Sequence, residues 1–320
     1  MLSNCPINQT ITDNLIRAYS KINSPKYKKI LCSISGGSDS DVMLDIVWKC
    51  DIDNKVDYVW FDTGLEYQAT KEHLKKLEEE YSIKIIRYKP KKSIPICCKE
   101  YGQPFISKHV SEMMSRLIKH GFQWEDKSFE ELYNTYPKCK IALKWWTNSH
   151  PSDLFNIQRN KFLKEYLIQN PPHFEISNKC CQYAKKNIAH QLVQYGDYDL
   201  NIIGVRRSEG GVRSTAYKSC FSETEEYDNY LPLFWYKDSD KNDYVETYGI
   251  ENSKCYTEYG LSRTGCAGCP YGRDFENELD IINHYEPKLY KAVNNIFGDS
   301  YECTRKYRAF RKKMEEEIKK

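Results

Sequence analysis

Apolar and polar positions in the first ninety residues follow two different periods. Apolar residues at helical spacing across residues 10–21 predict an amphipathic helix. Short apolar runs of strand length then alternate with helical patterns; the runs cover 28–33, 56–61 and 83–88, and the helices about 42–47 and 67–81. Strands that alternate with helices at this pitch predict right-handed crossovers. We therefore expect an α/β fold, in which a parallel sheet carries helices on both faces.

The alternation breaks after Pro90, and residues 91–178 show helical patterns with no clear strand. A further apolar run at 200–205 has the length of another strand of the same sheet. Residues from about 274 onward are again helical. The sequence therefore predicts four segments: residues 1–90 and 179–270 as two halves of one α/β domain, 91–178 as a helical insertion, and 271–320 as a helical C-terminal region.

A turn rich in glycine and serine separates the first predicted strand from the helix that follows it. The turn consists of Ser35, Gly36, Gly37, Ser38, Asp39 and Ser40. Ligands of an open parallel sheet bind at the carboxyl ends of its strands. Two glycines let the backbone curl around an anion, and the start of the helix offers unpaired N–H groups and a partial positive charge. The pattern indicates a phosphate site, while an ordinary capped strand-to-helix turn has the same composition.

Four motifs in a fixed chain order resemble those of a known enzyme family. The turn at 35–40 resembles the pyrophosphatase loop (PP-loop) of the adenine nucleotide α-hydrolase superfamily. The other three resemble motifs of the phosphoadenylyl-sulfate (PAPS) reductase family: Asp62-Thr63-Gly64, the segment from Gly204 to Arg213 with Gly210 in place of Ser, and Leu231–Trp235 followed by Asp240 and Tyr248. The resemblance covers about residues 28–90 and 179–270 and leaves the predicted insertion outside.

The resemblance implies an adenine nucleotide site and assigns its residues. Contacts to the nucleotide are assigned to the 35–40 turn and to Asp62, Thr63, Gly64, Gly204, Arg206, Arg207 and Glu209. Arg206, Arg207 and Arg213 are expected to hold phosphate or sulfate oxygens through their planar forks. Asp39 and Asp62 are expected to position Mg²⁺ on a nucleotide triphosphate. Without the resemblance, the arginines have a simpler interpretation, as a solvated loop paired with Glu209 and Glu223.

Two cysteine pairs form a second candidate site. Cys180-Cys181 and the Cys-x-x-Cys pair of Cys266 and Cys269 together supply four thiolates, which suit either a [4Fe–4S] cluster or Zn²⁺. Their order resembles the cluster motif of adenylyl-sulfate reductases, with Lys185-Lys186 where that family has Arg-Lys. A redox pair or buried thiols are the alternatives, and Cys255 is a possible substitute ligand. Cys97-Cys98 has no obvious second pair in the sequence.

Two reaction classes and one binding function fit these motifs. In the first, ATP adenylates a substrate with release of pyrophosphate, Asp39, Arg206 and Arg213 act in catalysis, and sulfur is then transferred to tRNA or DNA. In the second, a C-terminal cysteine attacks adenylyl sulfate and releases AMP; Cys303 follows Glu302 as in that family but lacks its Gly-Leu-His. The third is a nucleotide-sensing or nucleic-acid-binding module with a structural cluster. The complete PP-loop favours ATP chemistry.

Composition indicates the cellular compartment and the partners of these reactions. The chain has 320 residues, 13 of them cysteine, and a net charge of +3, so charge alone does not identify a nucleic-acid binder. Clustered cysteines in a long chain without a signal-peptide core indicate a reducing, cytoplasmic environment and metal binding rather than disulfides. We expect no membrane association, and an adenine nucleotide, a tRNA or DNA acceptor and a cysteine desulfurase or thioredoxin-like donor as partners.

Overall fold

The computed structural model describes residues 8–209 and 216–319. The chain divides into two compact units that each combine two stretches of sequence: Met1–Pro90 with Lys185–Cys266 (unit 1), and Lys91–Ala184 with Ala267–Lys320 (unit 2). The predicted insertion and the predicted C-terminal region therefore fall into the same unit. The unit boundaries differ from the predicted ones because the chain returns to the sheet domain at residue 185 and leaves it after residue 266.

Unit 1 contains a six-stranded sheet in the order β3-β2-β1-β4-β6-β5. Its strands are β1 (Ile30–Ser33), β2 (Val56–Phe61), β3 (Ile85–Tyr88), β4 (Leu200–Ile202), β5 (Phe221–Ser222) and β6 (Asp228–Tyr230). Every pairing is parallel except that of β5 with β6. The predicted α/β fold with a parallel sheet is confirmed, and the four predicted strands are present. The sequence did not predict β5 and β6.

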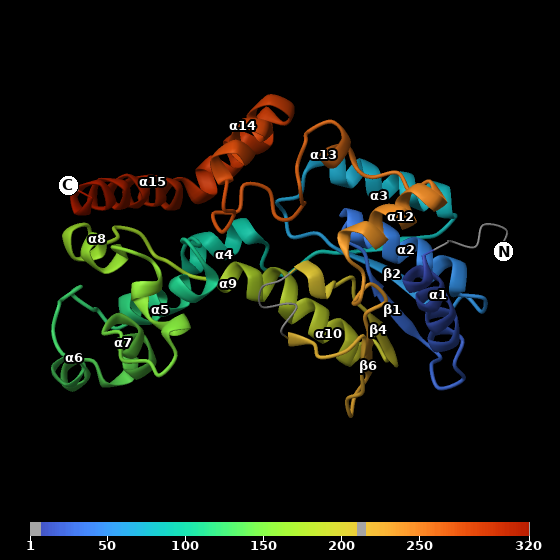
Figure 1. The fold of residues 1–320 in the computed structure, drawn as a ribbon, viewed down its shortest axis with the longest axis horizontal. Coiled ribbons are helices and arrows are strands. Elements are labelled where there is room, and N and C mark those ends of the chain that lie inside the picture. The colour runs from blue at the N-terminus through green and yellow to red at the C-terminus, as the bar shows by residue number, and fades with distance from the viewer. Residues whose placement is uncertain (1–7, 210–215, 320) are drawn as a thin grey trace. The chain divides into compact units, whose positions relative to one another are not determined.

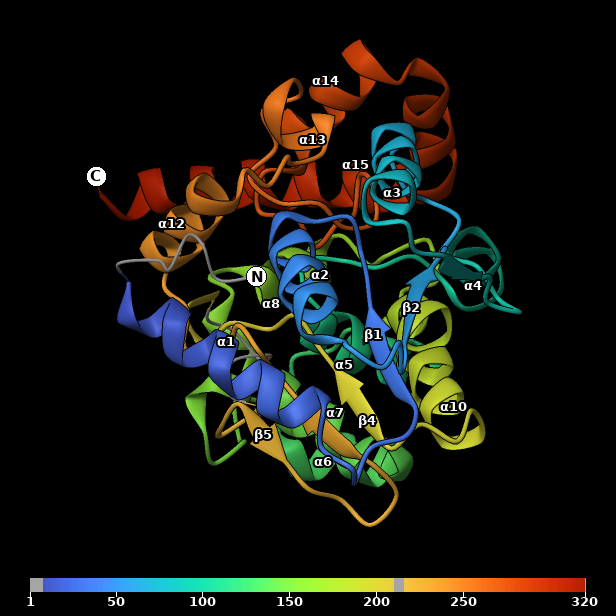
Figure 2. The ribbon, with the colours of Figure 1, turned by 90° about the vertical axis from the view of Figure 1, so that its right-hand side faces the viewer.

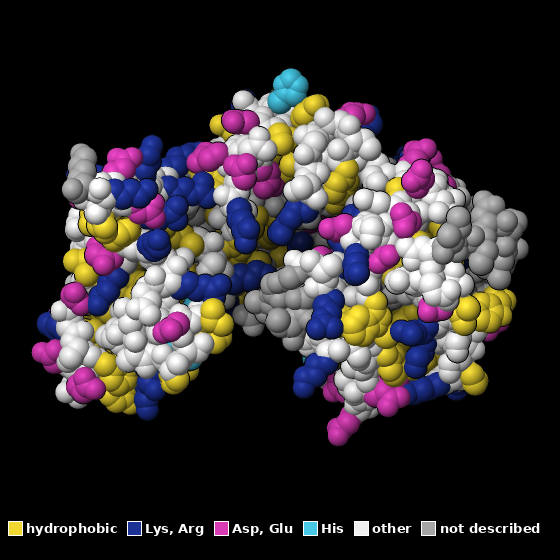
Figure 3. All heavy atoms as spheres, in the orientation of Figure 1, with side chains coloured by type: hydrophobic (Ala, Val, Ile, Leu, Met, Phe, Trp, Pro, Cys, Tyr) yellow, Lys and Arg dark blue, Asp and Glu magenta, His cyan; other side chains and the backbone are white. Residues whose placement is uncertain are grey.

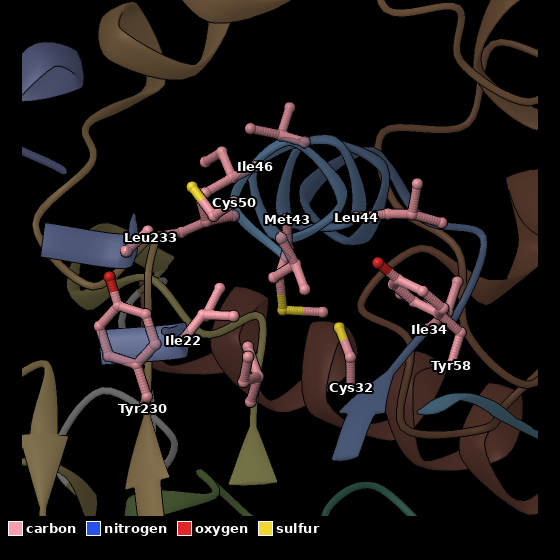
Figure 4. Packing of buried hydrophobic residues seen from close by; sticks show 14 of the residues in the cluster. Ile22, Cys32, Ile34, Met43, Leu44, Ile46, Cys50, Tyr58, Tyr230 and Leu233 are labelled. Carbon is pink, nitrogen blue, oxygen red and sulfur yellow. The ribbon is translucent and has the colours of Figure 1, made fainter. Parts of the chain in front are cut away.

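Helices cover both faces of this sheet, as Figures 1 and 2 show for α1 and α2 on one side of the strands and α10 on the other. The helices of unit 1 are α1 (Gln9–Ile22), α2 (Ser38–Cys50), α3 (Gln68–Tyr81), α10 (Asn187–Tyr195), α12 (Asp238–Tyr248) and α13 (Lys254–Thr257). Successive strand residues point to opposite faces. Cys32 of β1 accordingly packs in the cluster formed with α1 and α2, and Leu31 packs with Val193 of α10. Figure 4 shows Met43 of α2 pointing toward Cys32 of β1.

The central position of β1 creates a switch point in the sheet. The chain passes from β1 through α2 to β2 on one side, whereas β4 pairs with β1 on the other side. Loops that leave the carboxyl ends of two such strands diverge and open a crevice between them. The 35–40 turn follows β1, and the segment from Gly204 follows β4, so both predicted nucleotide motifs belong to this crevice.

Unit 2 is helical within the residues that the structure describes. Its helices are α4 (Ile94–Tyr101), α5 (Lys108–Lys119), α6 (Phe129–Thr135), α7 (Lys140–Trp146), α8 (Leu163–Gln169), α9 (Lys179–Cys181), α14 (Phe275–Tyr285) and α15 (Pro287–Ile318), with short 3₁₀ turns at Pro137–Cys139, Asp153–Phe155 and Ile157–Arg159. One apolar cluster joins the early helices to α15 and buries both Trp145 and Trp146. A π-helix at Gln182–Lys186 follows α9 directly.

Across the described part of the chain, every helix is too short or too polar to cross a bilayer.

Candidate functional site

The turn at residues 35–40 needs glycine at its second position. Gly36 has φ +67°, a conformation that L residues adopt at a cost. A Cβ atom at this position would lie 2.9 Å from Cγ2 of Thr70 on α3, closer than van der Waals contact allows. The turn is therefore held tightly against α3 by both its backbone conformation and its packing.

Backbone amides of the turn and of the start of α2 donate to nearby hydroxyl groups. Gly37 is the N-cap of α2, and no side chain caps this end of the helix. The Ser35 amide donates to Oγ of Ser40 over 2.8 Å, and the Ser38 amide donates to the hydroxyl of Tyr256 over 3.2 Å. That hydroxyl also accepts from the Thr264 amide at 3.2 Å. The N-terminus of α2 is thus surrounded by hydroxyl groups and amides, a suitable environment for an anion.

Asp39 and Arg206 form an ion pair between the loop that follows β1 and the loop that follows β4. Arg206 Nε donates to Asp39 Oδ2 over 2.9 Å, and Arg206 Nη1 donates to Asp238 Oδ1 over 2.7 Å. The Arg206 side chain is buried, and Ser208 Oγ accepts from Nη1 at 3.1 Å. The Arg206 side chain therefore pairs with two aspartates, while its backbone amide donates to Glu209 Oε1 over 3.4 Å.

The other oxygen of Asp39 has a cation beside it but no hydrogen-bond donor among the described residues. Asp39 Oδ1 is buried, accepts no hydrogen bond from these residues and is ion-paired with Lys241, whose Nζ lies 3.5 Å away. Burial raises the pKa of the neighbouring Glu209, and the charge and hydrogen bonding of Asp39 raise it further. A buried carboxylate oxygen of this kind fits the donor chemistry of Mg²⁺, which binds through one or two carboxylates and several waters.

The Asp62-Thr63-Gly64 turn at the end of β2 is organised by a carboxylate that sequence reasoning missed. Glu66 is buried and accepts from the backbone amides of Thr63, Gly64 and Leu65, each over 3.1 Å. Burial raises the pKa of Glu66. The sequence offered one signal for this role: Glu66 lies two residues after Gly64, where a carboxylate can reach back to the amides of the turn.

Asp62 itself is paired with a strand residue. Arg87 Nε on β3 donates to Asp62 Oδ2 over 2.8 Å, and the Gly64 amide donates to Asp62 Oδ1 over 3.0 Å. Burial acts to raise the pKa of Asp62, but these donors outweigh burial and lower it. Asp62 is therefore held as an anion in the turn, and its predicted contact to Mg²⁺ stays a prediction.

The remaining residues of the arginine motif have different surroundings. Arg207 lies over the ring of Trp235 at 5.7 Å, and its amide donates to the Phe234 carbonyl over 2.9 Å. A Cβ at Gly204 would lie 3.3 Å from Met43 Sδ, so glycine allows this backbone to approach α2 closely. Arg213, predicted to hold phosphate, lies outside the described residues.

The predicted cysteine ligands are divided between the two units. Cys180, Cys181 and Cys269 belong to unit 2, whereas Cys266 belongs to unit 1, where its thiol lies 3.8 Å from Thr63 Oγ1. Cys255 is also in unit 1 and contacts Thr70 Oγ1 at 3.5 Å. Within the described residues, no three His, Cys, Asp or Glu side chains form a group able to hold a metal ion as they stand. The predicted ligand set therefore stays a prediction.

Cys303, the predicted nucleophile of the reductase alternative, is a packed thiol. It lies on α15 within the apolar cluster of unit 2, and its side chain is 6% exposed. Burial raises the pKa of Cys303 to about 11. A reactive cysteine needs an accessible thiolate at neutral pH, so these surroundings are those of a structural residue.

A stretch of the chain that begins in unit 1 and continues into unit 2 is similar to a known domain. Residues 29–122 match the sequence model of the phosphoadenosine phosphosulfate reductase domain. The resemblance predicted from the motifs is confirmed over this stretch. The match extends beyond residue 90 into the predicted insertion, which corrects the expectation that the resemblance stops there, and it does not include residues 179–270.

Similarity to individual proteins is more distant. The chain is 34% identical over 302 residues to uncharacterized protein MJ0066 of Methanocaldococcus jannaschii, covering 91% of this chain and 47% of that protein. The chain thus spans about half the length of this curated relative. The PAPS reductase of Candida auris is 14% identical with a TM-score of 0.40, covering 79% of this chain and 86% of that one. The U34-tRNA thiolase NcsA of Methanococcus maripaludis, solved with its [4Fe-4S] cluster, is also 14% identical with a TM-score of 0.40, covering 95% of this chain and 80% of that one. Likeness at this level carries no functional conclusion.

Proposed function

We propose that unit 1 binds ATP at the switch point of its sheet and adenylates an acceptor with release of pyrophosphate. The observation that carries this proposal is the PP-loop turn, with Gly36 at positive φ and the uncapped start of α2 beside it. A reductase acting on adenylyl sulfate has no pyrophosphate to bind. A complete turn of this kind therefore favours a nucleotide triphosphate.

The residues of the crevice have distinct roles in this reaction. An acceptor oxygen attacks the α-phosphorus, the bond to the bridging oxygen breaks, and pyrophosphate leaves with the electron pair. The amides at the start of α2 bind the leaving phosphates, and Arg206 and Lys241 supply positive charge. Arg206 exchanges an aspartate partner for a phosphate oxygen, since its fork suits both. Asp39 Oδ1 would hold Mg²⁺, which neutralises charge on the triphosphate.

The cysteines of unit 2 extend the proposal to sulfur chemistry. A thiolate-bound cluster in the same chain as an adenylating domain suits transfer of sulfur to an activated tRNA or DNA acceptor, with a cysteine desulfurase or thioredoxin-like protein as donor. Lys and Arg side chains gather over α15, as Figure 3 shows, and offer contacts for a nucleic-acid backbone. The basic residues in the C-terminal half of this helix are Arg305, Lys306, Arg308, Arg311, Lys312 and Lys313.

Incubation with ATP labelled at the α-phosphate, Mg²⁺ and candidate tRNA or DNA tests the proposal. We expect pyrophosphate and an adenylated acceptor to form, AMP to be released when a sulfur nucleophile or water displaces it from the acceptor, and Asp39→Asn to abolish all three products. Asp53→Asn is the matched control, because Asp53 is an exposed aspartate of the same unit that pairs only with Lys55 among the described contacts. If labelled ATP stays intact while adenylyl sulfate yields sulfite, the proposal is wrong and the reductase alternative holds.

A further inference from the structure

The helical unit holds a buried cysteine beside Cys180 that the sequence left without a partner. Cys98 on α4 is 7% exposed and Cys180 on α9 is 4% exposed. Helices α4 and α9 pack against each other, which brings the Cys98 thiol close to Cys180, and both Cys181 and Cys269 are near enough to Cys180 to influence it electrostatically. Two buried and two partly buried thiols of unit 2 therefore lie in one region.

The backbone fixes this contact between α4 and α9. The Gln103 amide donates to the Glu175 carbonyl over 2.8 Å, and the Ser177 amide donates to the Gln103 carbonyl over 2.9 Å. Gly102, which ends α4 at φ +101°, is so close that a Cβ would lie 2.2 Å from the Glu175 oxygen. Only glycine permits this approach.

An aromatic pair reinforces the same junction. The rings of Tyr101 and Tyr183 stack with their centroids 5.2 Å apart, and Lys92 lies over both rings. Tyr101 is one helical turn after Cys98, and Tyr183 follows Cys180 by three positions. The two thiols are thus held between a backbone bridge and a ring stack.

Cys269 is presented from a turn that is equally well held. The Gly268 amide donates to Glu278 Oε1 over 3.0 Å, and the Gly268 carbonyl accepts from the Tyr301 hydroxyl. The Cys269 carbonyl accepts from the Gly272 amide over 2.8 Å. Both partners of Gly268 belong to helices of unit 2, so this turn is anchored to that unit.

We propose that Cys98, Cys180, Cys181 and Cys269 are the four thiolate ligands of the metal centre, with Cys98 in the place that sequence spacing gave to Cys266. The donor set is chemically right, because four thiolates suit an iron–sulfur cluster. It lies within one compact unit, whereas Cys266 belongs to unit 1 and contacts Thr63 there. No ready-made group of three donors exists among the described residues, so the thiols lose their protons and close around the metal as it binds.

Cys97 provides a matched control for Cys98. It is the adjacent residue on α4 and is fully buried, but its Sγ donates to the Lys92 carbonyl of its own segment over 3.5 Å. Substitution of Cys97 therefore removes a buried thiol from the same helix and leaves the proposed ligand set intact.

The test measures iron and acid-labile sulfide per chain in full-length protein purified without oxygen. We expect Cys98→Ser to lose the bound iron and the cluster absorption, and Cys97→Ser and Cys266→Ser to retain both. Cys98→Ala, which keeps the small apolar volume, serves as the second variant, and circular dichroism of each purified variant establishes that it is folded.

Retention of wild-type iron by folded Cys98→Ala, or loss of iron in Cys266→Ser equal to that in Cys98→Ser, would overturn the assignment. The inference rests on the cluster in the proposed function. A wild-type chain free of both iron and zinc would overturn the centre itself, while release of pyrophosphate from ATP reports separately on the nucleotide site.

Discussion

Gly36→Ala tests whether the turn at residues 35–40 depends on tight packing against α3. The substitution places an L residue at φ +67° and a methyl group 2.9 Å from Thr70 Cγ2. The left-handed conformation costs about 1–2 kcal/mol, and forcing a methyl group into a packed contact costs about 1–3 kcal/mol more. We therefore expect the free energy of unfolding to fall by about 2–5 kcal/mol.

A control at another glycine separates backbone strain from packing. Gly249, which ends α12, has φ +66° and no atom within 4 Å of its hypothetical Cβ. Gly249→Ala therefore carries the strain alone, and we expect a loss of about 1–2 kcal/mol. Both variants are compared with the wild type by urea denaturation followed by circular dichroism.

A second substitution relieves the packing term. Thr70→Ser removes the Cγ2 methyl and keeps the hydroxyl that contacts Cys255. In a double-mutant cycle, Thr70→Ser should restore part of the stability lost in Gly36→Ala and none of that lost in Gly249→Ala. If Gly36→Ala costs no more than Gly249→Ala, or if Thr70→Ser has the same effect in both backgrounds, the turn is not packed against α3 as described.

Two further predictions concern stability. Asp228 is buried and accepts from Tyr27 and Lys26, each over 2.6 Å; burial acts to raise the pKa of Asp228, but these donors lower it. The contribution of the Asp228 carboxylate to the free energy of unfolding is therefore present above the ordinary carboxyl pKa of about 4 and is lost as the pH falls below that value. Asp228→Asn should lower the free energy of unfolding by about 1–3 kcal/mol at neutral pH and by progressively less in acid. An equal loss at all pH values in denaturant titrations would contradict this. Trp146 is fully buried and donates to the Glu125 carbonyl over 2.8 Å, so Trp146→Ala should cost about 3–5 kcal/mol, whereas Trp235→Ala, at a ring 47% exposed, should cost much less in the same denaturation assay. Equal losses would show that Trp146 is not part of the core of unit 2.

The sheet could be predicted where the strands carry a clear apolar pattern. The apolar runs that form β1 to β4 are separated by segments with helical spacing of apolar residues. This change in the spacing of apolar residues identified the strands. By contrast, β6 is Asp228-Asn229-Tyr230 and β5 has only two residues, so neither carries a pattern that distinguishes a strand from a loop. β6 is a strand because it pairs with β4, and β5 is a strand because it pairs with β6. These pairings depend on the tertiary structure and leave no pattern in the local sequence.

The candidate nucleotide site was predicted in its parts but not in its pairings. Glycine at position 36 follows from local turn chemistry, whereas the role of the arginine after β4 was predicted from the resemblance to the PAPS reductase motif. That Arg206 meets Asp39 and Asp238 depends on the order of strands, which residue spacing does not contain. Cys98 shows the same limit, because its neighbour Cys180 is 82 positions away and is brought close by the contact between α4 and α9.

The interleaving of the two units has a consequence for synthesis on the ribosome. The apolar cluster of unit 2 includes Cys303 and Tyr307 of α15, which are made long after the helices between residues 91 and 184. The apolar faces of those early helices consequently stay exposed while the ribosome adds the second half of unit 1. A nascent chain halted before α15 should carry a completed sheet and a helical unit whose apolar cluster is still exposed. We expect chaperone binding to be strongest in this interval.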